Sequence, residues 1–143
     1  MYIVSSCLAG INCRYDGGNN LNEKVAKLVK EGKAIPVCPE MLGGLETPRT
    51  PSEIIRDEAG NRKVVNADGE DVTTEFIKGA MKTVSIAKIV EADQAIMKKN
   101  SPSCGYGEIY DGTFSNNLVE GNGITVDLLI ENGVEILTVD DLD

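Results

Sequence analysis

Three short apolar runs in this chain each end at, or shortly before, a cysteine. Short runs rich in β-branched residues and bounded by glycine or proline are typical of buried strands. The same residue type at the ends of three separate strands is hard to attribute to packing alone, so we expect a thiolate-lined site at one edge of a sheet. The three pairs are residues 2–6 with Cys7, residues 34–37 with Cys38, and residues 94–97 with Cys104.

The chain has 143 residues, 41% of them hydrophobic. We therefore expect one domain over residues 1–143 that buries a core without disulfides. Its 14 basic and 23 acidic residues give a formal net charge of -9, which argues against a nucleic-acid partner. No apolar run approaches the roughly 20 residues that span a bilayer, and the N-terminus lacks the features of a secretory signal. We expect no membrane association and a cytoplasmic location, where clustered reduced cysteines bind metal or react.

The order of the elements favours an α/β fold. Asn22 is expected to cap a helix with apolar residues at intervals of three and four, and Thr73 is expected to open a longer helix. A third helix is expected over 124–131 and a last strand over 134–139. This alternation predicts a mainly parallel sheet with helices on both faces, a Rossmann-like three-layer sandwich. Ligands of such sheets bind beyond the carboxyl ends of the strands, where all three cysteine-bearing turns would lie.

Two hairpins and two long loops are expected beside this sheet. Turn formers flank short extended runs in residues 54–71, and residues 105–114 alternate turn and aromatic residues as a short hairpin or lid would. Residues 7–20 are rich in glycine and asparagine, which is typical of a loop. The prolines and paired glycines of residues 39–53 predict no regular structure through most of that stretch.

The absence of histidine removes imidazole catalysis and every zinc site that needs a histidine. Proton transfer then depends on other groups, and the candidate carboxylates are Glu40, which lies next to the Cys38 segment, and Asp16 in the first loop. Asp16 can instead form an Asx turn or pair with Arg14. Ser101 and Ser103 are expected to orient water or substrate. The candidate substrate-binding residues in the two loops are Arg14, Tyr15 and Arg49.

Three thiolates bind soft metals and leave a fourth position open. One possibility is zinc held by Cys7, Cys38 and Cys104 with water or Glu40, in a hydrolase or a structural site. Another is a non-enzymatic module that binds a small molecule, with the cysteines as inert buried side chains. No Cys-x-x-Cys pair supports a thioredoxin-like motif or a zinc ribbon. For Cys13, a bystander role stays open beside ligation.

Four ordered motifs, which span nearly the whole chain, resemble a bacterial family of iron–sulfur-dependent thiouracil desulfidases, formerly a domain family of unknown function. The motifs are VSSCLAG at 4–10 with RYDG at 14–17, CPE at 38–40 with GGLETPR at 43–49, SPSCG at 101–105, and GNGIT at 121–125 with GVEI at 133–136.

The resemblance implies an oxygen-sensitive [4Fe-4S] cluster held by Cys7, Cys38 and Cys104, with one iron free of cysteine, and it leaves Cys13 outside the ligand set. It also implies a small-molecule thiolated substrate, such as 2-thiouracil, a related thiolated base or another thioamide. An open iron is a Lewis acid with affinity for sulfur, so it can polarise a C=S bond while water attacks the carbon. Such a hydrolysis needs no net electron transfer.

Overall fold

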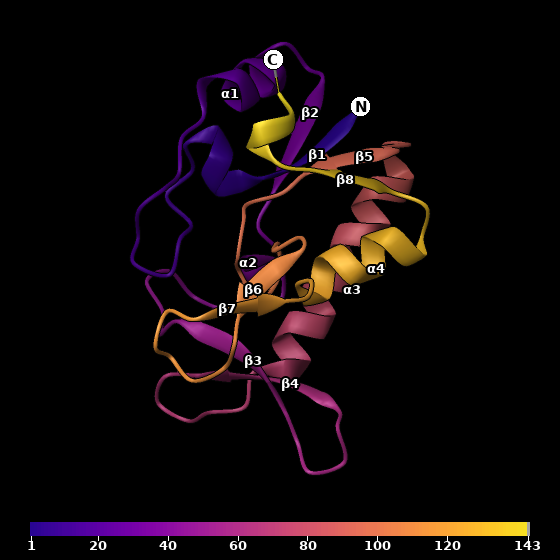
Figure 1. Cartoon of the computed structure of the whole chain (residues 1–143). Helices are drawn as coiled ribbons and strands as arrows, with labels where there is room; N and C mark the ends of the chain where they lie inside the picture. The colour runs from indigo at the N-terminus through magenta and orange to yellow at the C-terminus, as the bar shows by residue number, and fades with distance from the viewer. Residues whose placement is uncertain (143) are drawn as a thin grey trace.

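A four-stranded parallel sheet forms the core of the structure, a computed structural model that describes residues 1–142 (Figure 1). The strands lie in the order β2-β1-β5-β8, and each neighbouring pair is parallel. Pro36 lies in β2, an edge strand with β1 on one side and no strand on the other. An edge strand tolerates proline because no strand on its open side needs the missing N–H as a hydrogen-bond donor. The expected mainly parallel sheet is confirmed. The strands are β1 Tyr2–Ser5, β2 Ala34–Val37, β5 Gln94–Ile96 and β8 Glu135–Leu137.

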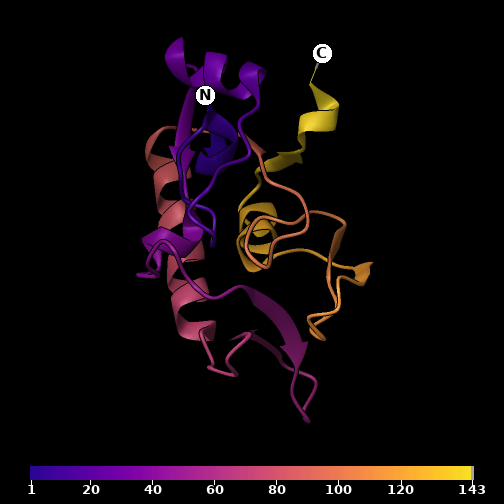
Figure 2. The same ribbon diagram turned by 90° about the vertical axis from the view of Figure 1, so that its left-hand side faces the viewer.

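Helices cover both faces of this sheet, because successive residues of a strand point to opposite sides. Ile3 belongs to the apolar cluster formed with α3 (Thr73–Ile89) and α4 (Ile124–Glu131), which pack side by side (Figures 1 and 2). Its neighbour Val4 belongs to the cluster formed with α1 (Glu23–Lys30) on the other side. This three-layer arrangement confirms the expected fold class.

The ends of α1 follow the signals in the sequence. The Asn22 side-chain oxygen accepts hydrogen bonds from the backbone N–H groups of Lys24 and Val25, at 3.0 and 3.1 Å, which caps the first turn. Gly32, just beyond the helix, adopts a left-handed φ of 74° that a residue with a Cβ adopts only with strain. The chain then turns directly into β2.

The stretch 39–53 departs from expectation at its start, where Pro39–Leu42 forms the short helix α2. Proline is favoured at the first helical position, since its missing N–H would have no partner there. The helix packs closely on α3 through two glycines: a Cβ on Gly43 would lie 1.9 Å from the Glu75 carbonyl oxygen, and one on Gly79 would lie 1.8 Å from the Pro39 carbonyl oxygen. This contact fixes the positions of Cys38 and Glu40, which flank Pro39.

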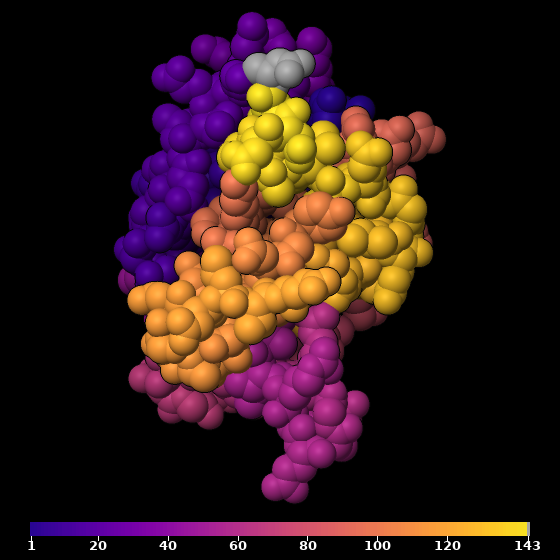
Figure 3. All heavy atoms as spheres, in the orientation of Figure 1, coloured from indigo at the N-terminus to yellow at the C-terminus, as the bar shows by residue number. Residues whose placement is uncertain are grey.

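Both expected hairpins are present, but the second extends beyond its expected range. Strands β3 (Ser52–Arg56) and β4 (Arg62–Asn66) pair antiparallel, as do β6 (Glu108–Tyr110) and β7 (Leu118–Glu120). The return strand β7 lies outside residues 105–114 because a wide turn separates it from β6. Figure 3 shows the β6–β7 segment, in orange, lying across one face of the molecule, beside N-terminal residues in indigo and above the β3–β4 hairpin in magenta.

The last strand, near the C-terminus, is also shorter than expected. Strand β8 ends at Leu137, because Thr138 and Asp141 form a capping box around the 3-10 turn η2, Val139–Asp141. The expected domain includes Asp143, which lies outside the described residues. Within residues 1–142, none of the helices has both the length and the apolar character needed to cross a bilayer.

Candidate active site

A cavity of about 450 Å³ lies where β1, β2 and β5 end. Its wall includes Ser5 and Val37, the last residues of β1 and β2, and all four cysteines of the chain. A cavity of this size is typical of small-molecule sites. The structure thus brings the strand-end cysteines into one place, as the parallel order of the strands requires. They are Cys7, Cys38 and Cys104.

Each of these three cysteines is placed by the turn that follows its strand. Cys7 lies in the 3-10 turn η1, Ser6–Ala9, and is buried, whereas Cys38 directly precedes α2 and is half-buried. Cys104 is buried in a turn that its own backbone N–H closes by donating to the Ser101 hydroxyl oxygen at 2.7 Å. Gly105 permits this turn, because a Cβ there would lie 2.7 Å from the Ser101 carbonyl oxygen.

Cys13, which the resemblance leaves outside the ligand set, lies within the same cavity wall. It is 3% exposed, and its backbone carbonyl oxygen accepts from the Cys38 thiol at 4.0 Å. The turn at Gly10, with a φ of 94°, folds the first loop back so that Cys13 returns to the sheet edge. A second cysteine in that glycine-rich loop was the sequence signal for this placement.

Hydrogen bonds among the thiols separate their pKa values. The Cys13 thiol lowers the pKa of Cys7 to about 6 and that of Cys38 to about 7. The same contacts, with Cys38 first, raise the pKa of Cys13. Burial raises the pKa of Cys104 to about 12. Cys7 and Cys38 therefore have thiolate character near neutral pH, the form in which cysteine binds metal, whereas Cys104 is protonated there.

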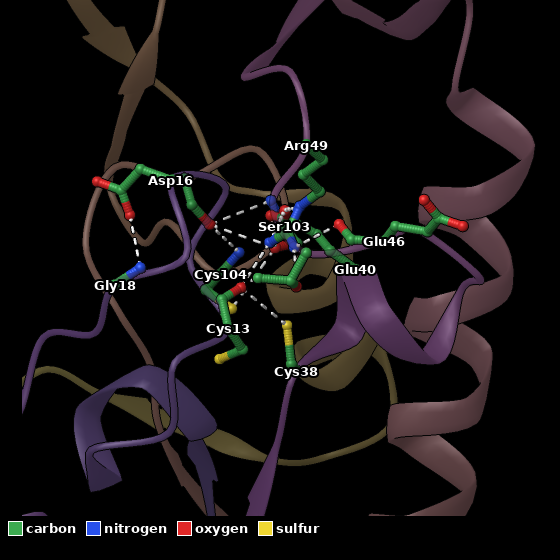
Figure 4. Close-up of polar contacts among 11 residues, drawn as sticks. Cys13, Asp16, Gly18, Cys38, Glu40, Glu46, Arg49, Ser103 and Cys104 are labelled. Atoms are coloured by element: carbon green, nitrogen blue, oxygen red, sulfur yellow. Dashed lines mark hydrogen bonds and ion pairs between the residues drawn. The ribbon is translucent and has the colours of Figure 1, made fainter.

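The Glu40 carboxylate lies on the cavity wall between Arg49 and Ser103 and is hydrogen-bonded to both (Figure 4). One carboxylate oxygen accepts from Arg49 Nε and Nη2 at 2.8 and 2.7 Å, and the other accepts from Ser103 Oγ at 2.9 Å. The Arg49 guanidinium also donates to the Cys13 carbonyl oxygen at 2.8 Å. Ser101 Oγ lies 3.3 Å from Ser103 Oγ. Four of the expected site residues thus form one hydrogen-bonded group beside the cysteines.

The structure separates the three remaining candidates. Arg14 and Tyr15 line the cavity, but Asp16 does not. The Asp16 carboxylate accepts from the Gly18 N–H at 2.9 Å and lies 3.5 Å from the Arg14 guanidinium. These are the Asx-turn and arginine contacts described above as the alternative. Asp16 is therefore connected to the site through its contact with Arg14. Arg14 Nη1 also donates to the Asn20 side chain at 2.9 Å.

Several cavity residues were not among the sequence candidates, because contacts distant in sequence place them there. Glu53 in β3 is 9% exposed and accepts from the backbone N–H groups of Gly112 and Phe114 at 2.9 and 3.2 Å. It thereby holds the β6–β7 turn beside the cavity. Ser5 Oγ accepts from the Lys98 N–H at 2.9 Å. Further lining residues that no sequence pattern indicated include Lys98, Tyr110, Phe114 and Asn116.

The donor chemistry of the cavity suits a soft, thiolate-bound centre. All four cysteines are free, and the chain has no histidine to compete with them. No three Cys, Asp or Glu side chains in residues 1–142 are grouped so as to hold one metal ion. A multi-iron cluster differs from a single ion, since each cysteine binds a different iron and the sulfurs need not meet at one point.

Comparison with known proteins decides the family. Residues 2–141 match the family described as 2-thiouracil desulfurase. The chain belongs to this family. Membership in the 2-thiouracil desulfurase family confirms the resemblance carried by the sequence motifs and makes the chain an enzyme, so the non-enzymatic binding module was the wrong alternative.

Two similar proteins extend this finding. The chain is 48% identical over 147 residues to "Uncharacterized protein YbbK" of Bacillus subtilis (strain 168), covering 99% of this chain and 97% of that protein. It is also similar to the solved structure of the [4Fe-4S]-dependent thiouracil desulfidase TudS, with a TM-score of 0.89 and 39% identity over 99% of this chain and 91% of the other. This member of the 2-thiouracil desulfurase family therefore shares the fold of TudS over almost its full described length.

Proposed function

We propose that this protein holds a [4Fe-4S] cluster through Cys7, Cys38 and Cys104, with one iron not bound by cysteine, and hydrolyses the C=S bond of a thiolated base. The observation that carries the proposal is the single cavity that these three strand-end cysteines share with the Glu40 carboxylate. The [4Fe-4S] dependence of TudS, at 39% identity, supports the same cofactor. The substrate class is 2-thiouracil-like bases or related thioamides.

The thiols that bind the cluster in this proposal differ in pKa and in burial. Cys7 and Cys38 offer thiolate character at neutral pH, whereas Cys104 offers a rigid buried position. The Cys13 thiol, with its single S–H, stabilises the negative charge of these two neighbours in this arrangement. When bound, the cluster supplies a Lewis-acidic iron with affinity for sulfur, which polarises the C=S bond.

Glu40 is the proton carrier of the proposed reaction. It removes a proton from the attacking water, whose oxygen bonds to the carbon as the C–S bond breaks, and the proton passes to the departing sulfur. Water and thiocarbonyl become carbonyl and hydrogen sulfide, with no net electron transfer. Arg49 holds one carboxylate oxygen, and Ser103, supported by Ser101, directs the other toward the cavity.

The first loop completes the substrate site in this proposal. Arg14 and Tyr15 contact the substrate from the cavity wall, and Asp16 orients Arg14 from outside it. The size of the cavity supports a small-molecule substrate rather than a nucleic acid, in agreement with the net charge of -9. We place the reaction in the cytoplasm, since the four free cysteines suit a reducing compartment.

Product analysis on protein purified without oxygen tests this function. Incubation with 2-thiouracil is expected to release uracil and sulfide in equal amounts, and Cys104→Ser is expected to abolish the release. No release from iron-loaded protein would contradict the proposal. Release from iron-free, zinc-loaded protein would instead support the zinc hydrolase.

A further inference from the structure

Asn20, at the end of the first loop, has a buried amide nitrogen that no other group satisfies. Its Nδ2 atom finds no hydrogen-bond partner among residues 1–142. A buried N–H donor without an acceptor is unfavourable, so it indicates a partner that the protein gains when it binds a cofactor or ligand. Asn20 does not itself line the cavity, so that partner is not the substrate.

The backbone holds Asn20 directly against Cys7. The Asn20 N–H donates to the Cys7 carbonyl oxygen at 2.9 Å, and the Asn22 N–H donates to the Leu8 carbonyl oxygen at 2.8 Å. These two hydrogen bonds tie the end of the first loop to the turn η1 just before α1 begins. The Asn20 side chain therefore starts from a fixed position beside one of the three proposed cluster ligands.

Arg14 determines which way the Asn20 amide faces. Arg14 Nη1 donates to Asn20 Oδ1 at 2.9 Å. A guanidinium can only donate, so the amide oxygen must face Arg14 and the NH2 group must face away from it. The pKa of Cys7 is lowered by Cys13 first and also by the Asn20 side chain, which agrees with an amide NH2 group directed toward the Cys7 sulfur.

We infer that Asn20 is a positioning residue for the cluster, whose side-chain N–H donates to the sulfur of Cys7 when Cys7 is a ligand. The inference rests on the proposed function and adds to it a residue outside the cavity wall. Hydrogen bonds to ligand sulfurs stabilise the additional negative charge of a reduced cluster, so they raise its reduction potential. Asn20 thus tunes the cluster through Cys7 without touching the substrate.

Pulsed EPR tests this hydrogen bond on protein that is loaded with cluster without oxygen and reduced with dithionite. The protein carries ¹⁵N only in the side-chain amide of asparagine, so a hyperfine coupling to the cluster spin reports an amide N–H next to a cluster sulfur. We expect this coupling in the wild type and in Asn19→Leu, and its loss in Asn20→Leu. Asn19 is the matched control because its exposed side chain bonds to Asn12 and to the Leu21 N–H instead.

The reduction potential is a second readout, which a merely structural role of Asn20 would not move. Asn20→Leu should lower the midpoint potential by about 59 mV, which corresponds to a tenfold change in a one-electron equilibrium. Asn19→Leu should keep the wild-type potential. Asn20→Asp keeps the acceptor for Arg14 but lacks the donor, so it should also lose the ¹⁵N coupling and takes the place of Asn20→Leu if that variant holds no cluster.

Three results would overturn the inference while leaving the desulfidase intact. They are a cluster-loaded wild type without the ¹⁵N coupling, a coupling that persists in Asn20→Leu, and an unchanged potential in that variant. If neither Asn20 variant holds a cluster, the presence or absence of the coupling in the wild type decides. A wild type that cannot be loaded with a cluster would overturn the proposed function together with the inference.

Discussion

At the scale of single residues, the site depends on which groups surround each thiol. Cys13 and Cys104 are both buried, yet Cys13 acts on the thiols of Cys7 and Cys38, whereas Cys104 lies in an apolar cluster with the Ser103 hydroxyl 3.6 Å from its sulfur. These surroundings have opposite effects on pKa: Cys13 lowers the pKa values of the thiols beside it, and burial raises the pKa of Cys104 itself. Cys13 favours thiolates beside it, whereas burial outweighs the hydrogen bonds of Ser5 and Ser103 and keeps Cys104 protonated near neutral pH.

Replacement of Cys13 by alanine is expected to raise the pKa of Cys7 from about 6, and that of Cys38 from about 7, toward the ordinary value of 9.0. A lowered pKa means that the thiolate is present above that pH, so alkylation of the wild-type, cluster-free protein should already be fast near neutral pH. Cys13→Ala should slow it there. Peptide-resolved alkylation rates against pH measure the effect, with Cys13→Ser as a control that keeps a donor. Identical profiles would contradict the assigned hydrogen bonds.

Glu40→Gln removes the proposed proton carrier but keeps the side-chain shape. We expect kcat to fall about a hundredfold to ten-thousandfold, as is usual for loss of a general base, with iron content retained. Glu46→Gln is the matched control, because Glu46 lies in the same segment on the exposed surface. Steady-state kinetics on both variants make the comparison. Full activity of Glu40→Gln would exclude Glu40 from proton transfer.

At the scale of elements, the contact between α2 and α3 positions Cys38 and Glu40 together. The Pro39 carbonyl oxygen lies where a Cβ of residue 79 would be, so glycine alone allows this approach. The hairpin β6–β7 is held in a different way, by the buried Glu53 carboxylate. Backbone contacts therefore hold both elements in place beside the cavity.

Gly79→Ala should force α2 away from α3. We expect the free energy of unfolding to fall by about 1–3 kcal/mol, as is typical of overpacking, and the protein to retain less iron because Cys38 moves. Lys78→Ala, on the exposed side of the same helix, should have neither effect. Denaturant midpoints and iron content measure both variants. An unchanged midpoint and unchanged iron in Gly79→Ala would show that the close approach is not needed.

At the scale of the whole molecule, local sequence signals were sufficient to predict the layers of sheet and helices. They were insufficient to predict which residues line the cavity. Asn22, Gly32 and the cysteine-terminated runs each act within a few residues, so the parallel sheet and its helices could be predicted. Helix α2 departs from expectation because proline, which breaks the interior of a helix, is favoured in the first turn, where Pro39 lies. Glu53 and Lys98 reach the cavity through hydrogen bonds to residues far along the chain, which no local pattern encodes.

The central claim is that Cys7, Cys38 and Cys104 hold one cluster and that Cys13 only supports it. The most direct measurement is the content of iron and acid-labile sulfide per chain, determined without oxygen for the four single cysteine-to-alanine variants. We expect about four irons in the wild type, as a [4Fe-4S] cluster requires, a similar content in Cys13→Ala, and almost none in the other three. Loss of iron only in Cys13→Ala, or wild-type iron in any of the other three, would contradict the account.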